Sequence, residues 1–240
     1  MLLTGHQPNY LPYLGFFHKI YHAGMFVIVD NVQFVKRGPF GWMNRNKIRT
    51  AEGARWLTVP VLVKGKFEQQ IKDTKINTAL PWARKHWRTL ARSYSKAPYF
   101  TRYADFFDET YNKKKWENFC DLSTHLIFFL LKALGIDRPV KIASELGGRG
   151  KGDDLILDLC EKTGADAYLH GKHGADYIDE EKFRARGVGC AYQNFEHPVF
   201  RQQHLPFLSH LSVVDLLFNH GAESLEILLG RKIYSEKKIS

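Results

Sequence analysis

A short apolar segment near the start of the chain most constrains its fold. Residues 25–30 read MFVIVD, so an unbroken run of apolar side chains ends at the carboxylate of Asp30. Such a run is typical of a parallel strand that helices cover on both faces. A helix is predicted just before it, from about Pro12 to His22, because proline fits the first turn and apolar side chains recur at near-helical spacing. The sequence therefore predicts an opening strand, a helix and a buried parallel strand by residue 30.

The rest of the chain divides into a hairpin, a helical block and an alternating region. Residues 44–50 and 56–63 flank 51–54 as a predicted β-hairpin, and 80–134 carry helical patterns. Short strands, with helices between them, are predicted at 140–143, 167–169 and 188–192. Because strands that alternate with helices pair in parallel, we predict an α/β fold with an open, mostly parallel, Rossmann-like sheet. We expect one domain over residues 1–240, with 80–134 as a helical insertion within it.

The loop after the first predicted strand carries the main catalytic candidate. It reads GHQPNYLPYLG from Gly5, and open α/β sheets bind ligands at the carboxyl ends of their strands. His6 is the best general acid/base candidate because histidine titrates nearest neutral pH; the alternative is a structural histidine. Asp30, at the end of the next strand, is the second catalytic candidate. It could orient His6, hold a metal or accept hydrogen bonds from a ribose or amine, or it could cap the following turn.

The predicted hairpin carries several cations on one strand. The two-residue period of a strand places Arg45, Lys47 and Arg49 on the same face. Such a face is either an anion-binding surface or a solvated edge. Asn44 and Asn46 on the same strand favour the first interpretation, because their amides can bind a carbonyl group or an amide without moving protons.

Further polar residues near the same edge of the sheet are candidates to bind substrate. The segment 170–174 follows a predicted strand directly, and another histidine lies just beyond the next one. The predicted substrate-binding residues are Gln7, Asn9, Tyr10, Gln33, Lys36, Asn44, Arg45, Asn46, Lys47, Gly171, His173 and His197.

The cysteines and histidines do not predict a metal site or a disulfide. Cys120, Cys160 and Cys190 are odd in number and widely spaced, and no CxxC or Cys/His ligand spacing occurs. Several histidines could converge at the edge of the sheet, but a metal site needs fixed ligand geometry that sequence does not supply. We therefore predict no metal ligands.

The charge of the chain favours anionic partners. Its 35 Lys and Arg residues against 25 Asp and Glu give a formal net charge of +10. Such a field attracts phosphates, nucleotides, nucleic acid or an acidic carrier, although a merely soluble basic surface has the same composition. The first helix of the 80–134 block is strongly basic with tryptophan interleaved. It could follow a polyanion, but inward packing of the apolar residues with solvated cations is the favoured interpretation.

No segment predicts membrane insertion. The longest purely apolar run, 126–131, is far too short to span a bilayer. The first residues resemble a strand rather than a charged leader with an apolar segment and a cleavage site. We expect a cytoplasmic protein, and the oligomeric state is left open.

Several sequence blocks resemble one known family. They are HQPNYLPYLGFF, FVIVDNVQFVKR, NRNKIRT followed by WLTVPV, YLHG, FEHPVF and LSVVDLLFNHG. Over roughly residues 3–221 the chain is similar to the WbqC-like family. The resemblance implies a role in bacterial surface-polysaccharide (O-antigen) biosynthesis, with transfer of a glycyl or aminoacyl group to an amino sugar.

The resemblance and the candidate residues together suggest a direct acyl transfer. His6 would take the proton of the amine, while Asn44, Asn46 or a backbone amide stabilises the carbonyl oxyanion. Arg45 and Lys47 would hold the phosphates of a nucleotide sugar or the phosphate of an aminoacyl carrier or tRNA. No cofactor is certain, and a nucleotide or phosphopantetheine-type acyl donor fits the cations. The alternatives are a nucleotidyltransferase-like enzyme and a nucleotide-sugar or RNA binding module without catalysis.

Overall fold

A five-stranded parallel sheet forms the centre of the molecule. The computed structural model describes residues 1–35, 43–172, 174–176 and 178–232. The strands are β1 (Leu2–His6), β2 (Met25–Ile28), β5 (Val140–Ile142), β6 (Ala167–His170) and β7 (Gly189–Tyr192). They lie in the order β5-β2-β1-β6-β7, and each neighbouring pair is parallel. The predicted open parallel sheet is confirmed.

The predicted hairpin is present but tighter than expected. Strand β3 (Arg45–Thr50) pairs antiparallel with β4 (Gly53–Thr58). Thr50 and Gly53 form the last pair, so only residues 51 and 52 make the turn. The second strand therefore starts before the predicted residue 56, and it stops short of Pro60, which has no N–H to donate to a ladder.

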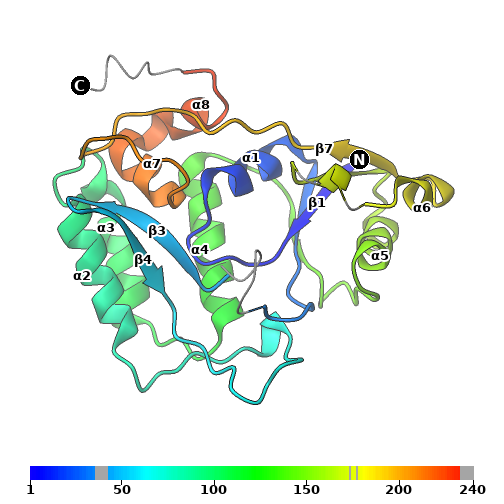
Figure 1. Ribbon diagram of the computed structural model, residues 1–240, viewed down its shortest axis with the longest axis horizontal. Coiled ribbons are helices and arrows are strands. Elements are labelled where there is room, and N and C mark those ends of the chain that lie inside the picture. The colour runs from blue at the N-terminus through cyan, green and yellow to red at the C-terminus, as the bar shows by residue number, and fades with distance from the viewer. Residues whose placement is uncertain (36–42, 173, 177, 233–240) are drawn as a thin grey trace.

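Helices cover both faces of the sheet and the hairpin (Figure 1). They are α1 (Leu14–His22), α2 (Trp82–Tyr94), α3 (Phe100–Asp108), α4 (Phe119–Leu134), α5 (Asp153–Thr163), α6 (Glu180–Ala185), α7 (Val213–His220) and α8 (Ser224–Leu228). The helices α2, α3 and α4 fall inside the block predicted to be helical. They share one hydrophobic core with the hairpin, and we propose that this block is an insertion within a single domain.

Alternating side chains of β2 divide the apolar interior into two cores. Phe26 and Ile28 point into the larger core, which includes residues of α1, α4, the hairpin and α7. Val27 points to the opposite face and packs in a smaller core with residues such as Leu159 of α5 and Phe183 of α6. Both faces of β2 are therefore covered, as its unbroken apolar sequence predicts.

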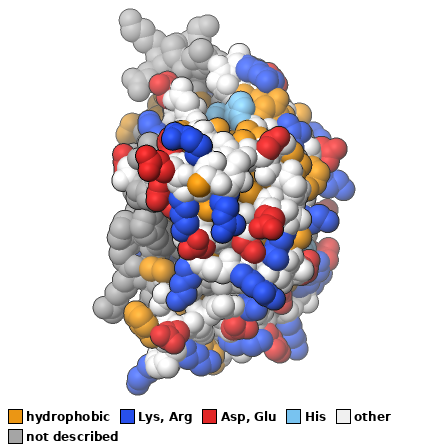
Figure 2. All heavy atoms as spheres, turned by 90° about the vertical axis from the view of Figure 1, so that its right-hand side faces the viewer, with side chains coloured by type: hydrophobic (Ala, Val, Ile, Leu, Met, Phe, Trp, Pro, Cys, Tyr) orange, Lys and Arg blue, Asp and Glu red, His pale blue; other side chains and the backbone are white. Residues whose placement is uncertain are grey.

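Acidic and basic side chains are mixed on the end of the molecule that carries α5 and α6. Figure 2 faces this end and shows Lys and Arg interspersed with Asp and Glu. Ion pairs join Lys182 to Asp154 at 2.7 Å and Lys162 to Asp158 at 3.6 Å. Within the described residues, the helices are all too short or too polar to cross a bilayer.

Arg49 is not part of a cationic face open to anions. Its side chain is buried at 2% exposure. The guanidinium donates hydrogen bonds to the carbonyl oxygens of Thr50 at 3.0 Å, His204 at 3.3 Å and Pro206 at 3.1 Å. The prediction that it shares an anion-binding surface is therefore wrong: it instead fastens the segment before α7 to the hairpin.

Arg49→Met tests this structural role. The substitution leaves buried carbonyl oxygens without donors, so the free energy of unfolding should fall by about 2–4 kcal/mol. Urea titration measures the change. Arg55→Met, at an exposed position on β4, is the matched control and should change stability by no more than about 0.5 kcal/mol. Equal losses in the two variants would contradict the assignment.

Candidate functional site

A cavity of about 550 Å³ opens at the carboxyl end of the central strand β1. The chain passes from β1 to β2 on one side and later returns to β6 on the other, so the order of the sheet reverses between β1 and β6. Strand β1 pairs with β6 at Leu2 and Leu3, whereas its pairing with β2 continues to His6. Open α/β sheets bind ligands at such a switch point.

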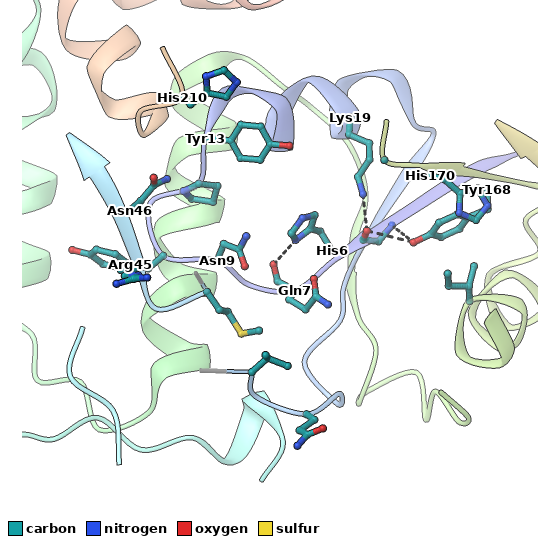
Figure 3. Close-up of a pocket in the computed structure, with 18 of the residues that line it drawn as sticks. His6, Gln7, Asn9, Tyr13, Lys19, Arg45, Asn46, Tyr168, His170 and His210 are labelled. Atoms are coloured by element: carbon teal, nitrogen blue, oxygen red, sulfur yellow. Dashed lines mark hydrogen bonds between the residues drawn. The ribbon is translucent and has the colours of Figure 1, made fainter. Parts of the chain in front are cut away.

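His6 presents a neutral imidazole to this cavity (Figure 3). Its Nδ1 lies 3.0 Å from the carbonyl oxygen of Gln7, which can only accept, so Nδ1 carries the proton. Burial, with the charge of Lys19 adding to it, lowers the pKa of His6 to about 3. Among the described residues Nε2 has no hydrogen-bond partner, so its lone pair is available to a ligand.

Lys19 lines the same cavity and was not predicted. It projects from the sheet-facing side of α1, is 7% exposed, and its Nζ donates to the carbonyl oxygen of Gly5 at 3.0 Å. Burial lowers the pKa of Lys19 to about 8. The available signal was a single lysine next to Ile20 on the otherwise apolar face of a predicted helix.

Tyr168 holds the two strands apart at the base of the cavity. Its hydroxyl accepts a hydrogen bond from the N–H of Gly5 at 2.9 Å and lies 3.3 Å from the Gly5 carbonyl oxygen. A Cβ atom on Gly5 would sit 3.0 Å from this hydroxyl and 3.1 Å from a methyl group of Val29. The close approach therefore favours glycine at position 5, because a larger residue would push the Tyr168 hydroxyl and Val29 away.

The end of β6 contributes a second neutral histidine. His170 is buried, and its Nε2 has no hydrogen-bond partner in the described part of the chain. Its ring packs against Tyr168, Phe183 and Tyr192. Burial, with a smaller contribution from Lys19, lowers the pKa of His170 to about 4. The predicted residue Gly171 also lines the cavity, as the position after this strand suggests.

Several predicted residues from the opening loop and the hairpin meet in this cavity. Gln7 and Asn9 lie next to His6, and within the described residues their side-chain amides have no hydrogen-bond partner (Figure 3). Gln33 also lines the cavity, with its Nε2 donating to the carbonyl oxygen of Phe67 at 2.8 Å. Asn46 lies opposite, but its amide already donates to a main-chain carbonyl.

Of the two other cations on β3, Arg45 reaches the cavity and Lys47 does not. The guanidinium of Arg45 lies over the Trp56 ring at 4.6 Å, beside the cavity. The Lys47 ammonium lies at 5.5 Å from the same ring. Among the described residues, the cationic part of the site is therefore formed by Arg45 and Lys19, rather than by the predicted strand face.

Other predicted residues are used inside the fold. Asp30 is 3% exposed, and its carboxylate accepts hydrogen bonds from the backbone N–H and hydroxyl of Ser144 at 2.9 and 2.5 Å. It does not line the cavity with His6. Asn44 donates to the Val59 carbonyl oxygen at 2.7 Å and is also outside the cavity. Both side chains connect elements of the fold.

Tyr10 and His197 also have their polar atoms engaged. The Tyr10 ring borders the cavity, but its hydroxyl contacts Nδ1 of His86 at 2.8 Å within the core. His197 donates from Nδ1 to the Pro198 carbonyl oxygen at 2.9 Å and accepts the backbone N–H of His210 at Nε2 at 3.1 Å. His197 thus supports the loop through which His210 reaches the cavity.

Two predicted binding residues, Lys36 and His173, lie outside the described residues. Residues lining the cavity that sequence reasoning did not single out include Tyr13, Lys19, Tyr168 and His210. Tyr13 belongs to the opening loop, whereas Tyr168 and His210 reach the cavity through the packing of distant segments, so no local pattern distinguishes them.

Comparison with known proteins places the chain in a family. The sequence model of the WbqC-like protein family matches residues 7–227. The chain belongs to this family. A relative described as "Uncharacterized protein Rv1507c", from Mycobacterium tuberculosis, is 33% identical over 223 residues, covering 92% of this chain and 95% of the relative. No solved structure matches the chain. The resemblance seen in the sequence is confirmed.

Lys19→Met tests the burial of the cation. The folded protein holds the proton of Lys19 less tightly than the unfolded chain, because its pKa of about 8 lies below the ordinary 10.5. The stability of the wild type relative to the variant should therefore rise between pH 8 and 10.5, by up to about 3 kcal/mol. Chemical denaturation across this range measures it, with the exposed Lys132→Met as baseline. A flat difference would show that the ammonium is solvated.

Proposed function

We propose that this WbqC-like protein is a transferase that acylates the amine of an anionic small molecule, with His6 as general base. One observation carries the proposal. His6 holds its proton on Nδ1 against a main-chain carbonyl and turns Nε2 into a cavity that Lys19 and Arg45 also line. An imidazole in this state can accept a proton, and the cations suit a substrate that bears phosphate.

The proposed reaction is a direct transfer. The neutral amine nitrogen attacks the carbonyl carbon of the acyl donor, so that a C–N bond forms and the bond from carbon to the leaving oxygen or sulfur breaks. The amine proton passes to Nε2 of His6 and then to the leaving group. No serine or cysteine nucleophile lines the cavity within the described residues, which favours transfer without a covalent enzyme intermediate.

The side-chain amides of Gln7 and Asn9 are the proposed oxyanion donors. They replace Asn44 and Asn46 in this role, because the amides of those residues donate to main-chain carbonyl groups. Gln7 and Asn9 both line the cavity beside His6. A preorganised amide donor stabilises the negative charge that develops on the carbonyl oxygen in the transition state.

The substrate class follows from the cations and the family. Lys19 and Arg45 would bind the diphosphate of a nucleotide sugar. Burial is the main cause of the low pKa of His6, and the negative charge of the ligand would offset the smaller contribution of the Lys19 ammonium. Binding of the substrate would therefore make His6 a stronger base. We propose an amino sugar as acceptor and a glycyl or aminoacyl group as acyl group, delivered from a nucleotide, phosphopantetheine-type, carrier or tRNA donor, in surface-polysaccharide biosynthesis.

His6→Gln separates an enzyme from a binding module. Glutamine keeps the size of the side chain but cannot accept the amine proton, so turnover should fall by at least about 100-fold while ligand affinity changes little. Acylation of amino-sugar nucleotides is followed by mass spectrometry, and affinity by calorimetry. His22→Gln, at an exposed position at the end of α1 outside the cavity lining, is the matched control. If affinity falls and no turnover of wild type is found with any donor, the protein is a binder.

Arg45→Gln tests the phosphate role. Loss of the guanidinium should weaken binding of a nucleotide sugar by about 10-fold at low salt, with a smaller loss at high salt where charge is screened. Calorimetry at two ionic strengths measures this. Lys47→Gln lies on the same strand outside the cavity and should have little effect. Equal effects of the two substitutions would assign the attraction to the whole hairpin face.

A further inference from the structure

A second hollow, of about 640 Å³, lies at the other end of the hairpin from the cavity. Arg45 at the start of β3 lines the cavity with His6, whereas Thr50 at the end of β3 lines this second hollow. Its walls come from the hairpin turn, α2 and residues 203 and 204. We call it the basic groove.

Cations from two elements face the basic groove. Arg55 comes from β4, Arg88 and Arg92 from α2, and Lys96 from just beyond α2, and all are exposed. Glu52 is the acidic residue among the described lining. Its pKa is lowered by hydrogen bonds first and by the nearby arginines to a smaller degree. The groove therefore keeps a clear excess of positive charge.

The arrangement differs from the opposite end of the molecule. Around α5 and α6, acidic side chains lie between the basic ones and form ion pairs with them (Figure 2). Helix α2 contains no acidic residue, and Lys85, Arg88, Arg92 and Lys96 follow one another along one face. Like charges one turn apart destabilise a helix slightly. No acidic residue of α2 offsets this repulsion. Glu52 of the hairpin turn offsets part of it, and a bound anion would offset the remainder.

The groove offers several contacts to phosphate groups and few to a base. Ser93 and Ser95 add hydroxyl groups to the cations, and the described lining contains one ring, that of His204, and no Phe, Tyr or Trp. The nearby Trp87 is stacked on Phe100. The side chain of Gln203 also lines the groove.

The length of the cationic face favours a chain of phosphates over a single compact one. From Arg88 to Lys96, the cations of this face that line the groove, a rise of 1.5 Å per residue spans about 12 Å. A free nucleotide would cover part of this face and would leave its base without a pocket. We propose that the basic groove binds the phosphate backbone of a nucleic-acid strand without reading its bases. This proposal does not depend on the proposed acyl transfer.

Paired double substitutions test the proposal. Binding of a labelled single-stranded RNA of about 16 nucleotides is followed by fluorescence anisotropy over a range of salt concentrations. Arg88→Gln with Arg92→Gln should weaken binding at least 10-fold. The slope of log affinity against log salt should decrease in magnitude by about 1.4, the value for two lost phosphate contacts.

The control removes the same charge at the other end of the molecule. Arg184→Gln with Arg186→Gln changes exposed residues at α6 and should leave affinity and slope within about two-fold of wild type. Equal weakening by both double variants would overturn the proposal, because net charge alone would then explain the attraction. The absence of RNA binding at low salt would also overturn it. Displacement of the RNA by ATP at equal phosphate concentration would assign the groove to free nucleotides instead.

Discussion

The candidate site depends on a tyrosine hydroxyl that replaces part of a β-ladder. Strands β1 and β6 pair at Leu2 and Leu3, and beyond them the Tyr168 hydroxyl contacts the backbone N–H and carbonyl of Gly5. The Gly5 N–H would otherwise be buried without an acceptor, which is costly, whereas the Gly5 carbonyl oxygen also accepts from Lys19. The bulk of the ring keeps the strands apart while their hydrogen bonds are satisfied. A continuous ladder would close the space into which His6 and His170 face.

The buried ammonium of Lys19 determines the charge state of this space. Its Nζ donates to the Gly5 carbonyl oxygen, and it forms no ion pair with a carboxylate among the described residues. It adds to burial in lowering the pKa of both His6 and His170. The site thus combines a cation with neutral imidazoles. Because a buried cation without a counter-charge is unfavourable, the arrangement favours an anionic ligand.

The sequence predicted those features that are set by local pattern. The apolar run of β2, the hairpin and the histidine at the end of β1 follow from periodicity and from turn residues. It also predicted the opening loop as a candidate ligand site, but it could not assign Asp30, whose carboxylate accepts a hydrogen bond from Ser144 just beyond the neighbouring strand β5. Nor could it distinguish Arg49 from Arg45, since both lie on one strand face and only the packing of residues 204–206 buries the former. Long-range packing decides such cases.

The hairpin gives the cavity and the basic groove a fixed separation. Arg45 lines the cavity and Thr50 lines the basic groove, and the part of β3 between them is about 17 Å long. Arg49 donates hydrogen bonds to the carbonyl oxygens of residues 204 and 206 and so fixes their segment to the hairpin. Residues 203 and 204 of this segment line the basic groove, and the segment continues to His210, which lines the cavity. An acyl donor that bound in both the cavity and the basic groove would need its phosphate backbone and its reactive acyl group at least about 17 Å apart. An aminoacylated nucleic acid satisfies this condition, whereas a compact acyl nucleotide would occupy the cavity alone.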